Sequence, residues 1–197
     1  MARANPNDAE GNPSRRVLSY DEVLRGARAH FLQRGTIALD SLAAELGVSR
    51  ATLYRLIEGR DRLLGDVLWS LGEPVLRRAM DEHGAATMDA ILEISIAFYR
   101  EMAGARPFRT FLEAEPGTAV RVLFTPAGAV HERAVGVQKE IFARARTAGL
   151  PLAEDLDGLA YLYVRIVESL LYADLLSGRA PDLTLVERAA RAVLAVR

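Results

Sequence analysis

Residues 39–64 read LDSLAAELGVSRATLYRLIEGRDRLL, and this stretch decides the fold. Its first half, up to Leu46, carries apolar residues at helical spacing, and Gly47 then interrupts the pattern. Ser49 can open a second short helix that runs through Arg55, because a serine side chain caps the free N–H groups of a first turn. Two short helices joined by a turn that contains glycine predict a helix-turn-helix.

The second helix of this pair presents a short, basic surface that carries hydroxyl groups. Val48 and Leu53 are its expected apolar contacts with the first helix, and they leave the opposite side in solvent. Guanidinium and hydroxyl groups bind phosphates and base edges in a major groove. The sequence therefore predicts a DNA-binding face on this helix. Its residues are Arg50, Ala51, Thr52, Tyr54 and Arg55.

Length and composition restrict the class of protein. The chain has 197 residues, half of them apolar, which suffices for one sizeable core or for a small domain fused to a larger one. Cysteine is absent, so no disulfide or thiolate chemistry is expected. No run approaches the ~18 apolar residues of a membrane span, and the first residues lack the apolar core of a signal peptide. We therefore expect a cytoplasmic protein without a membrane partner.

Charge is distributed unevenly along the chain, although the net charge is only −1. Residues 15–62 contain nine arginines against six acidic residues. This excess alone is a weak argument for nucleic acid. Arg60 and Arg62 lie in the first turn of an expected helix, where the helix dipole disfavours cations. A bound phosphate would relieve the mismatch, which favours DNA at this end.

The whole chain predicts helices and no strand, so the fold class is all-α, with about nine or ten helices. Residues 1–16, rich in Asn, Pro and Gly, are expected to be disordered, either as a solvated leader or as a basic arm along DNA. Residues 17–65 are expected to form a three-helix helix-turn-helix domain. Residues 66–197 are expected to form a helical C-terminal domain for ligand binding and dimerisation.

Proline and glycine punctuate the expected C-terminal domain. Glu73-Pro74 predicts a kink or a junction between the two domains. Thr125-Pro126 predicts a helix start, with an N-cap residue followed by proline. A single helix is expected from near residue 154 to residue 177, with Gly178 as its C-cap.

Residues 159–176, which read LAYLYVRIVESLLYADLL, are apolar on all sides of the expected helix. A surface helix would show one polar face, so this helix must be covered on both sides. One cover is the protein's own core, and the other is a partner subunit in a two-fold homodimer. The alternative is a central helix in a monomeric bundle. The expected dimer interface comprises Leu159, Leu162, Ile166, Leu170 and Ala173.

Aromatic residues of the C-terminal half suggest a small-molecule pocket, because such sites are mostly apolar with a few polar groups. Plain core packing is the alternative. Arg165 and Glu168 are spaced to pair with each other, or Glu168 points into the cavity. The expected pocket residues are Phe98, Tyr99, Met102, Phe108, Phe111, Phe124, Tyr163, Glu168 and Tyr172.

Nothing in the sequence predicts catalysis. His30, His83 and His131 lie far apart, and none falls in a metal or nucleophile motif. Acidic residues are plentiful but unclustered, as on any solvated helix surface. We therefore expect no enzyme activity, no cofactor and no metal site.

Residues 20–71 resemble the DNA-binding domain of the TetR family of bacterial transcriptional regulators. The resemblance is most specific in Gly47-Val48-Ser49, in Thr52-Leu53-Tyr54-Arg55, and in Arg60 ahead of Leu63-Leu64. It implies an all-helical homodimer, a palindromic operator and an effector pocket in the C-terminal domain. Ile57 stands where the family usually has an aromatic residue. Gly59 and Arg60 replace Ser and Lys, and the arginine keeps the charge while adding a bidentate fork.

By matching position, the resemblance implies roles for individual residues. Ser49 and Thr52 would contact phosphate or bases, Arg50 would reach base edges, and Tyr54 would hold phosphate. Arg60 would match the basic residue at the start of the fourth helix that binds phosphate. Thr36 lies where the family often has a phosphate-contacting threonine before its second helix.

Residues 165–182 also resemble the QsdR-like subgroup of this family, which is associated with control of γ-lactone and quorum-signal degradation. The resemblance implies a neutral, amphipathic lactone or acyl-lactone as effector. The main functional hypothesis is thus an operator-binding repressor released by a small molecule. The alternatives are a helical ligand-binding or adaptor module without operator binding, and an activator of the same family.

Overall fold

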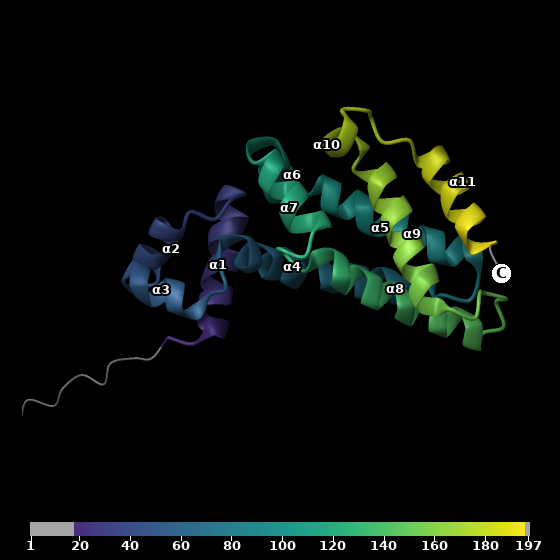
Figure 1. Cartoon of the computed structure of the whole chain (residues 1–197), viewed down its shortest axis with the longest axis horizontal. Coiled ribbons are helices and arrows are strands. Elements are labelled where there is room, and N and C mark those ends of the chain that lie inside the picture. The colour runs from purple at the N-terminus through teal and green to yellow at the C-terminus, as the bar shows by residue number, and fades with distance from the viewer. Residues whose placement is uncertain (1–17, 196–197) are drawn as a thin grey trace, which may run out of the picture.

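The computed structural model describes residues 18–195, which form helices joined by turns (Figure 1). The arm expected at residues 1–16 lies outside the described residues. No strand occurs between residues 18 and 195, so the prediction of an all-α fold is confirmed. The helices are α1 (Tyr20–Arg34), α2 (Leu39–Glu45), α3 (Arg50–Leu56), α4 (Arg60–His83), α5 (Met88–Gly104), α6 (Arg106–Ala114), α7 (Pro116–Phe124), α8 (Val130–Thr147), α9 (Leu156–Leu171), α10 (Ala173–Ser177) and α11 (Leu183–Leu194).

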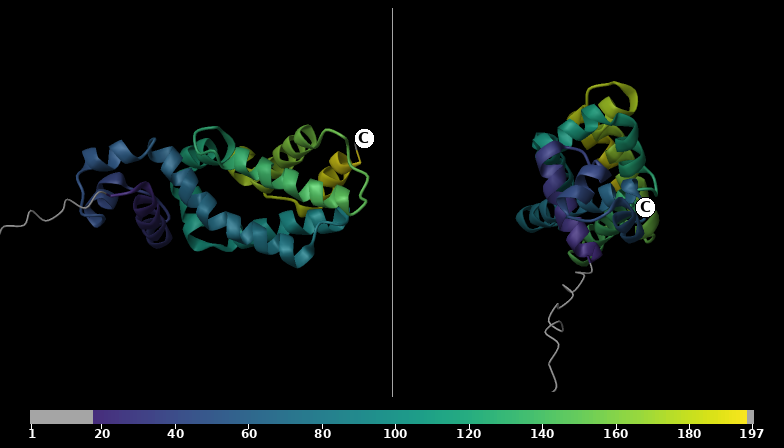
Figure 2. Two further views of the ribbon diagram at one scale, coloured as in Figure 1. Left: turned by 90° about the horizontal axis from the view of Figure 1, so that it is seen from below. Right: turned by 90° about the vertical axis from the view of Figure 1, so that its left-hand side faces the viewer.

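The molecule is elongated, with the head formed by α1, α2 and α3 at one end (Figure 1). The helix α4 leaves this head and runs along the remaining helices, as the view from below also shows (Figure 2). The helices α5, α8, α9 and α11 form the opposite end of the molecule. The head therefore projects from the larger helical body on a single long helix.

Local sequence signals account for the ends of the head helices. Ser19 and Glu22 make both hydrogen bonds of a capping box at the start of α1. Gly35 ends α1 in the left-handed region at φ 72°, and Gly47 turns the chain between α2 and α3 at φ 66°. The Ser49 side chain caps the first turn of α3. The predicted helix-turn-helix is thus confirmed.

The described residues contain eleven helices rather than nine or ten, because the chain turns at positions with weak local signals. Tyr172 leaves the helical region at φ −107° and ψ 32°, which divides the helix expected over residues 154–177 into α9 and α10. The helix expected at Thr125-Pro126 begins later. A turn continues through Ala129, which has φ 54°, and α8 starts at Val130.

Pro74 does not interrupt α4, which is continuous from Arg60 to His83. Its ring lies on the exposed side of the helix, where a lost backbone hydrogen bond can be replaced by water. The kink or junction expected at Glu73-Pro74 is therefore wrong as a helix boundary. The expected domain boundary between residues 65 and 66 falls within α4, so this helix belongs to both parts of the molecule.

Two hydrophobic clusters form the core, and α4 contributes to both. Leu63, Leu64 and Val67 are fully buried with the head, while Ala79 and Met80 pack into the C-terminal cluster. The helices α6 and α7 join the head cluster rather than the C-terminal one. The head is therefore joined to the rest of the molecule by α4, which packs into both clusters, and by the short helices α6 and α7, which pack with the head.

Two glycines permit a close backbone approach between α4 and the turn before α8. A Cβ atom built on Gly65 would lie 2.6 Å from Gly128 Cα, and closer still to the Gly128 carbonyl oxygen. Real Cβ atoms do not approach backbone atoms so closely, so any side chain at residue 65 would force α4 away from this turn.

We expect Gly65→Ala to lower the free energy of unfolding by about 2–3 kcal/mol, because backbone atoms cannot yield as a flexible side chain would. Gly136→Ala is the matched control, since residue 136 lies in the exposed part of α8 with open space around it. The control should raise the free energy of unfolding by about 0.5–1 kcal/mol. Urea denaturation measures both, and equal effects would contradict the close approach.

Candidate functional site

The outer side of α3 carries an exposed row of polar side chains. Tyr54 is 47% exposed, and the Arg50 guanidinium lies 5.8 Å from its ring centroid. Arg50 Nε also contacts Asp40 Oδ1 at 2.7 Å, in an ion pair open to solvent. Arg55 Nη2 donates to Thr52 Oγ1 at 3.3 Å. These contacts are weak because they are exposed, so the groups are free to exchange them for phosphate or bases.

Leu53 is fully buried on the opposite side of α3, and Ser49 holds the first turn through its side-chain oxygen. The helix is therefore fixed by one apolar anchor and one cap while its polar side faces solvent. Six of the eight residues expected to bind DNA lie on or beside this helix. They are Ser49, Arg50, Ala51, Thr52, Tyr54 and Arg55.

Thr36 and Arg60, the other two residues expected to bind DNA, lie together. Arg60 Nη2 donates to Thr36 Oγ1 at 3.2 Å, and both side chains contact Glu115, which lies between α6 and α7. No local pattern indicates this third residue, because Glu115 lies 55 positions from Arg60 along the chain. These two groups are therefore held against the body of the molecule.

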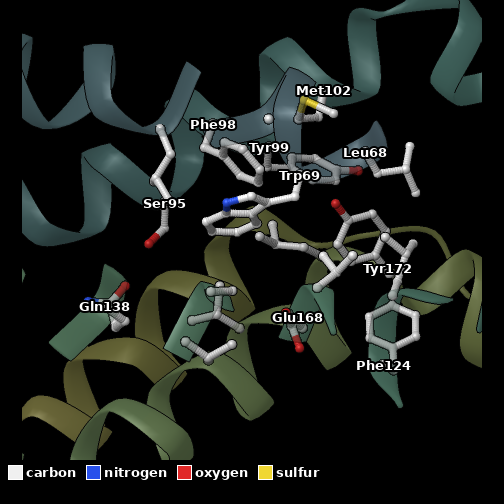
Figure 3. A pocket seen from close by; sticks show the side chains of 18 of the residues that line it. Leu68, Trp69, Ser95, Phe98, Tyr99, Met102, Phe124, Gln138, Glu168 and Tyr172 are labelled. Atoms are coloured by element: carbon white, nitrogen blue, oxygen red, sulfur yellow. The ribbon is translucent and has the colours of Figure 1, made fainter. Parts of the chain in front are cut away.

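An apolar cavity of about 110 Å³ lies between α4, α5, α8 and α9, with the ends of α6, α7 and α10 nearby (Figure 3). Trp69, Phe98, Tyr99 and Met102 cover one side, as Figure 3 shows. Tyr172 meets Phe124 edge-to-face, with ring centroids 5.5 Å apart. A cavity with this lining suits a small apolar or amphipathic molecule.

A few polar groups interrupt the apolar lining. Ser95 Oγ and Tyr163 OH share a hydrogen bond of 3.1 Å. Glu168 Oε2 lies 2.8 Å from Nδ1 of the largely buried His131. The Gln138 side chain is 6% exposed, and its Nε2 has no partner among the described residues. An unsatisfied buried amide is costly, so a ligand with a complementary polar group would gain from binding it.

Burial keeps the tyrosine hydroxyls of the cavity neutral. It raises the pKa of Tyr163 to about 12, against which the hydrogen bond with Ser95 acts. Burial also raises the pKa of Tyr172, and the Glu168 carboxylate adds to this effect. Tyr99 has a raised pKa through burial and, secondly, through Asp174. These hydroxyls therefore act as hydrogen-bonding groups and not as charges.

Comparison with known proteins decides the family. A family model described as "Tetracyclin repressor-like, C-terminal domain" matches residues 86–195, which is more than half of the chain. The chain belongs to the TetR family. It is accordingly a DNA-binding transcription regulator and not an enzyme.

Two solved structures of TetR-family proteins are similar to the chain. The transcriptional repressor QsdR of R. erythropolis is 26% identical, with a TM-score of 0.82 over 90% of this chain and 94% of that chain. A putative TetR-family regulator from Mesorhizobium loti MAFF303099 is 16% identical, with a TM-score of 0.48 over 89% of this chain and 92% of that chain. No curated protein matches the chain.

Most residues expected in the effector pocket of this TetR-family chain line the cavity. They are Phe98, Tyr99, Met102, Phe108, Phe124, Tyr163, Glu168 and Tyr172. Phe111 does not line it. Its ring is fully buried against Phe31 of α1, with centroids 6.0 Å apart, and it belongs to the head cluster.

Sequence reasoning missed several lining residues, among them Trp69, Ser95 and Gln138. The only tryptophan of the chain, in the middle of a helical pattern, was a usable signal for Trp69. Of the two alternatives for Glu168, the structure has the one in which it lines the cavity and not the pair with Arg165. Arg165 Nη1 donates to the Phe124 carbonyl oxygen at 3.2 Å, and Glu168 is bound to His131 instead.

The residues expected at a dimer interface lie at different depths. Leu159 is 5% exposed and belongs to the C-terminal cluster, whereas Leu162 is 42% exposed. Ile166 and Leu170 are half-buried at the edge of that cluster, and Ala173 is half-buried at the start of α10.

None of the described helices combines the length and apolar composition that a membrane crossing requires.

Trp69 can report on cavity occupancy, because it is the only tryptophan and lines the cavity. A small apolar ligand that enters the cavity, for which alkyl γ-lactones are the probes, should change the emission of Trp69 and raise the melting temperature, since it would bind only the folded state. Ala134→Phe places a ring in the cavity and should abolish the change, whereas Ala86→Phe at an exposed position should not. A response that survives in Ala134→Phe would place the ligand elsewhere.

Proposed function

We propose that the chain is a repressor that binds a palindromic operator as a homodimer and is released by a small amphipathic effector in the cavity. The observation that carries the proposal is the position of α4. This helix begins at Arg60 beside the head and lines the cavity with Leu68, Trp69, Gly72 and Leu76. A ligand that changes how α4 packs in the cavity would therefore change how the head is held.

Release requires that the effector prefer one conformation of the protein. A ligand with equal affinity for two conformations shifts nothing, whereas one that prefers the conformation unable to bind DNA lowers operator affinity. The make-up of the cavity supports such a preference, because residues of α4, α5, α8 and α9 all line it. Any movement of α4 against the other three helices alters its shape.

The lining supports a neutral effector. The Glu168 carboxylate at the cavity disfavours an anionic ligand, and the apolar side chains disfavour any unpaired charge. A carbonyl oxygen of the ligand would satisfy an N–H of the Gln138 amide, which lacks a partner among the described residues. A lactone with an alkyl tail has these properties, and we propose this class of effector.

The proposed dimer uses the exposed apolar residues of α9 and α11. Leu162 and Leu185 are 42% and 44% exposed, on two helices that pack against each other. Ile166 lies one turn after Leu162 on α9. A two-fold axis beside this surface would bring the same patch of two copies together. The two heads would then read half-sites about 34–36 Å apart in successive major grooves.

The cellular location follows from the proposed target. Because this target would be chromosomal DNA, we place the repressor in the bacterial cytoplasm.

The operator is tested by selecting duplexes from a random-sequence pool with the wild-type chain. Tyr54→Ala with Arg55→Ala should weaken binding of the selected duplex by roughly tenfold or more, because phosphate and base contacts are lost together. The exposed Arg144→Ala, near the end of α8, removes one positive charge far from the head and outside the proposed dimer surface, and it serves as control. Selection of no duplex, or binding that the double variant leaves unchanged, would contradict operator binding.

The dimer is tested by sedimentation. Leu162→Glu should give a monomer, because a carboxylate cannot be buried between two copies without a partner. Leu32→Glu is the matched control, since this leucine is 48% exposed on α1 in the head. A monomeric wild type, or a Leu162→Glu variant that sediments as the wild type does, would argue against this interface.

A further inference from the structure

Arg60, the first residue of α4, uses its guanidinium on three groups of the same chain. Its Nε donates to the Ile37 carbonyl oxygen at 2.7 Å. Its Nη2 donates to Thr36 Oγ1 at 3.2 Å and to Glu115 Oε1 at 2.6 Å. The ion pair with Glu115 is half-buried, with 28% and 23% of the two side chains exposed. This guanidinium is therefore held in one position and not extended into solvent.

Thr36 completes the cluster. Its hydroxyl donates to the same oxygen, Glu115 Oε1, that accepts from Arg60. Although burial acts to raise it, the pKa of Glu115 is lowered, because Arg60 and Thr36 both donate to the carboxylate. The carboxyl is therefore ionised at neutral pH. We call these three side chains the Glu115 cluster.

The Glu115 cluster occupies the groups that a phosphate would use. Thr36 and Arg60 are the two phosphate-binding candidates of the head that lie outside α3 and its cap. A carboxylate and a phosphate both accept from a guanidinium through oxygen atoms of similar spacing. The nitrogen that donates to Glu115 cannot make an equal bond to a phosphate at the same time. The two anions therefore compete for one set of donors.

The Glu115 carboxylate also compensates for the unfavourable positive charge in the first turn of α4. Arg60 and Arg62 place positive charge in a first turn where the helix dipole disfavours it. Glu115 supplies the anion that sequence reasoning assigned to a phosphate. Asp61 of the same turn is bound to Arg121 of α7 at 3.0 Å. An internal anion thus stands where an operator phosphate is expected.

Glu115 lies where cavity occupancy can move it. It joins α6 to α7, and Phe108 of α6 and Phe124 of α7 line the cavity. The helix α6 also packs against the end of α1, where a Cβ atom on Gly35 would lie 2.6 Å from Thr110 Cβ. The carboxylate therefore lies between two helices that, like α4, line the cavity and belong to the head cluster.

We propose that Glu115 competes with operator phosphate for Arg60 and Thr36, and that this exchange carries part of the coupling between cavity and operator. The inference rests on the proposed function as a repressor and adds the residue that regulates it. In the conformation that favours the effector, the Glu115 cluster is closed. In the operator complex, phosphate replaces the carboxylate.

An opposite role would give an opposite result. If Glu115 only orients Arg60 toward phosphate, removal of its charge weakens operator binding. If Glu115 competes, removal of its charge strengthens binding, because the donors of Arg60 and Thr36 are no longer occupied by an anion. The sign of the change in affinity therefore separates the two roles.

The experiment uses the full chain and the duplex that the wild type selects from a random-sequence pool, at one fixed salt concentration. We expect Glu115→Gln to bind this duplex roughly three- to tenfold more tightly, less than the effect of one fully buried charge-assisted hydrogen bond, because the pair with Arg60 is partly exposed. Glu113→Gln is the control, because it removes the same charge from an exposed residue two positions away. It should change the affinity by less than twofold, since exposed charges are largely screened.

Whether Glu115 acts through Arg60 is tested by making Glu115→Gln in a protein that also carries Arg60→Ala. With Arg60→Ala, Glu115→Gln should strengthen binding by less than about twofold, because the charged donor for which Glu115 competes is gone and only the neutral Thr36 hydroxyl remains. Thermal unfolding and sedimentation of each variant show that fold and assembly persist, and Glu115→Ala serves if Glu115→Gln does not fold. Weaker or unchanged binding by Glu115→Gln, or a gain that persists undiminished without Arg60, would overturn the inference.

The two proposals fail in different ways. If the wild type selects a duplex and Glu115→Gln does not strengthen binding, the role of Glu115 is excluded and operator binding stands. If neither the wild type nor Glu115→Gln selects any duplex, operator binding is excluded and the inference with it.

Discussion

The helix α4 packs into both hydrophobic clusters, and the rest of the molecule depends on this shared packing. Leu63 and Leu64 are fully buried with the head, and Met80, more than four turns later, is buried with the C-terminal helices. Because the helix is unbroken, the head cannot be repositioned without a change in the packing of α4 along the body. The approach of Gly65 to Gly128 fixes the helix in its second turn. A cavity lined by this helix is therefore a site from which the head can be controlled.

Polar contacts also join the head, α4 and the body, and these contacts can break and form again. Asp66 of α4 accepts from Tyr20 of α1 and from Arg133 of α8, so one carboxylate connects head, long helix and body. The Glu115 cluster does the same between α6–α7 and the start of α4. Apolar packing resists separation, whereas a half-buried ion pair can exchange one anion for another at small net cost. The two kinds of contact thus have different roles in a protein that must change its affinity for DNA.

Sequence reasoning succeeds where short-range rules decide the structure. Gly47 and Ser49 act within one turn of chain, so the helix-turn-helix and its solvent face were predictable. Pro74 was misleading because a proline on the exposed side of a long, well-packed helix costs too little to end it. Tyr172 was missed as a helix break because its surroundings, Tyr99, Phe108 and Phe124, come from other helices.

In the pocket, Phe111 and Phe108 are equivalent by composition, and only the packing of α6 decides which ring faces the cavity. Glu115 could not be paired with Arg60 from sequence, since 55 positions separate them.

The proposed regulation requires a coupling between the cavity and the DNA-binding head, and thermodynamic linkage tests this coupling most directly. The affinity of the wild-type chain for its selected duplex is measured with and without a lactone that changes Trp69 emission, and the affinity for the lactone is measured with and without the duplex. Linkage requires the two ratios to be equal. We predict that the lactone weakens duplex binding, by roughly five- to 150-fold, and that the duplex weakens lactone binding by the same factor. Equal duplex affinity in the presence and absence of bound lactone would contradict this coupling.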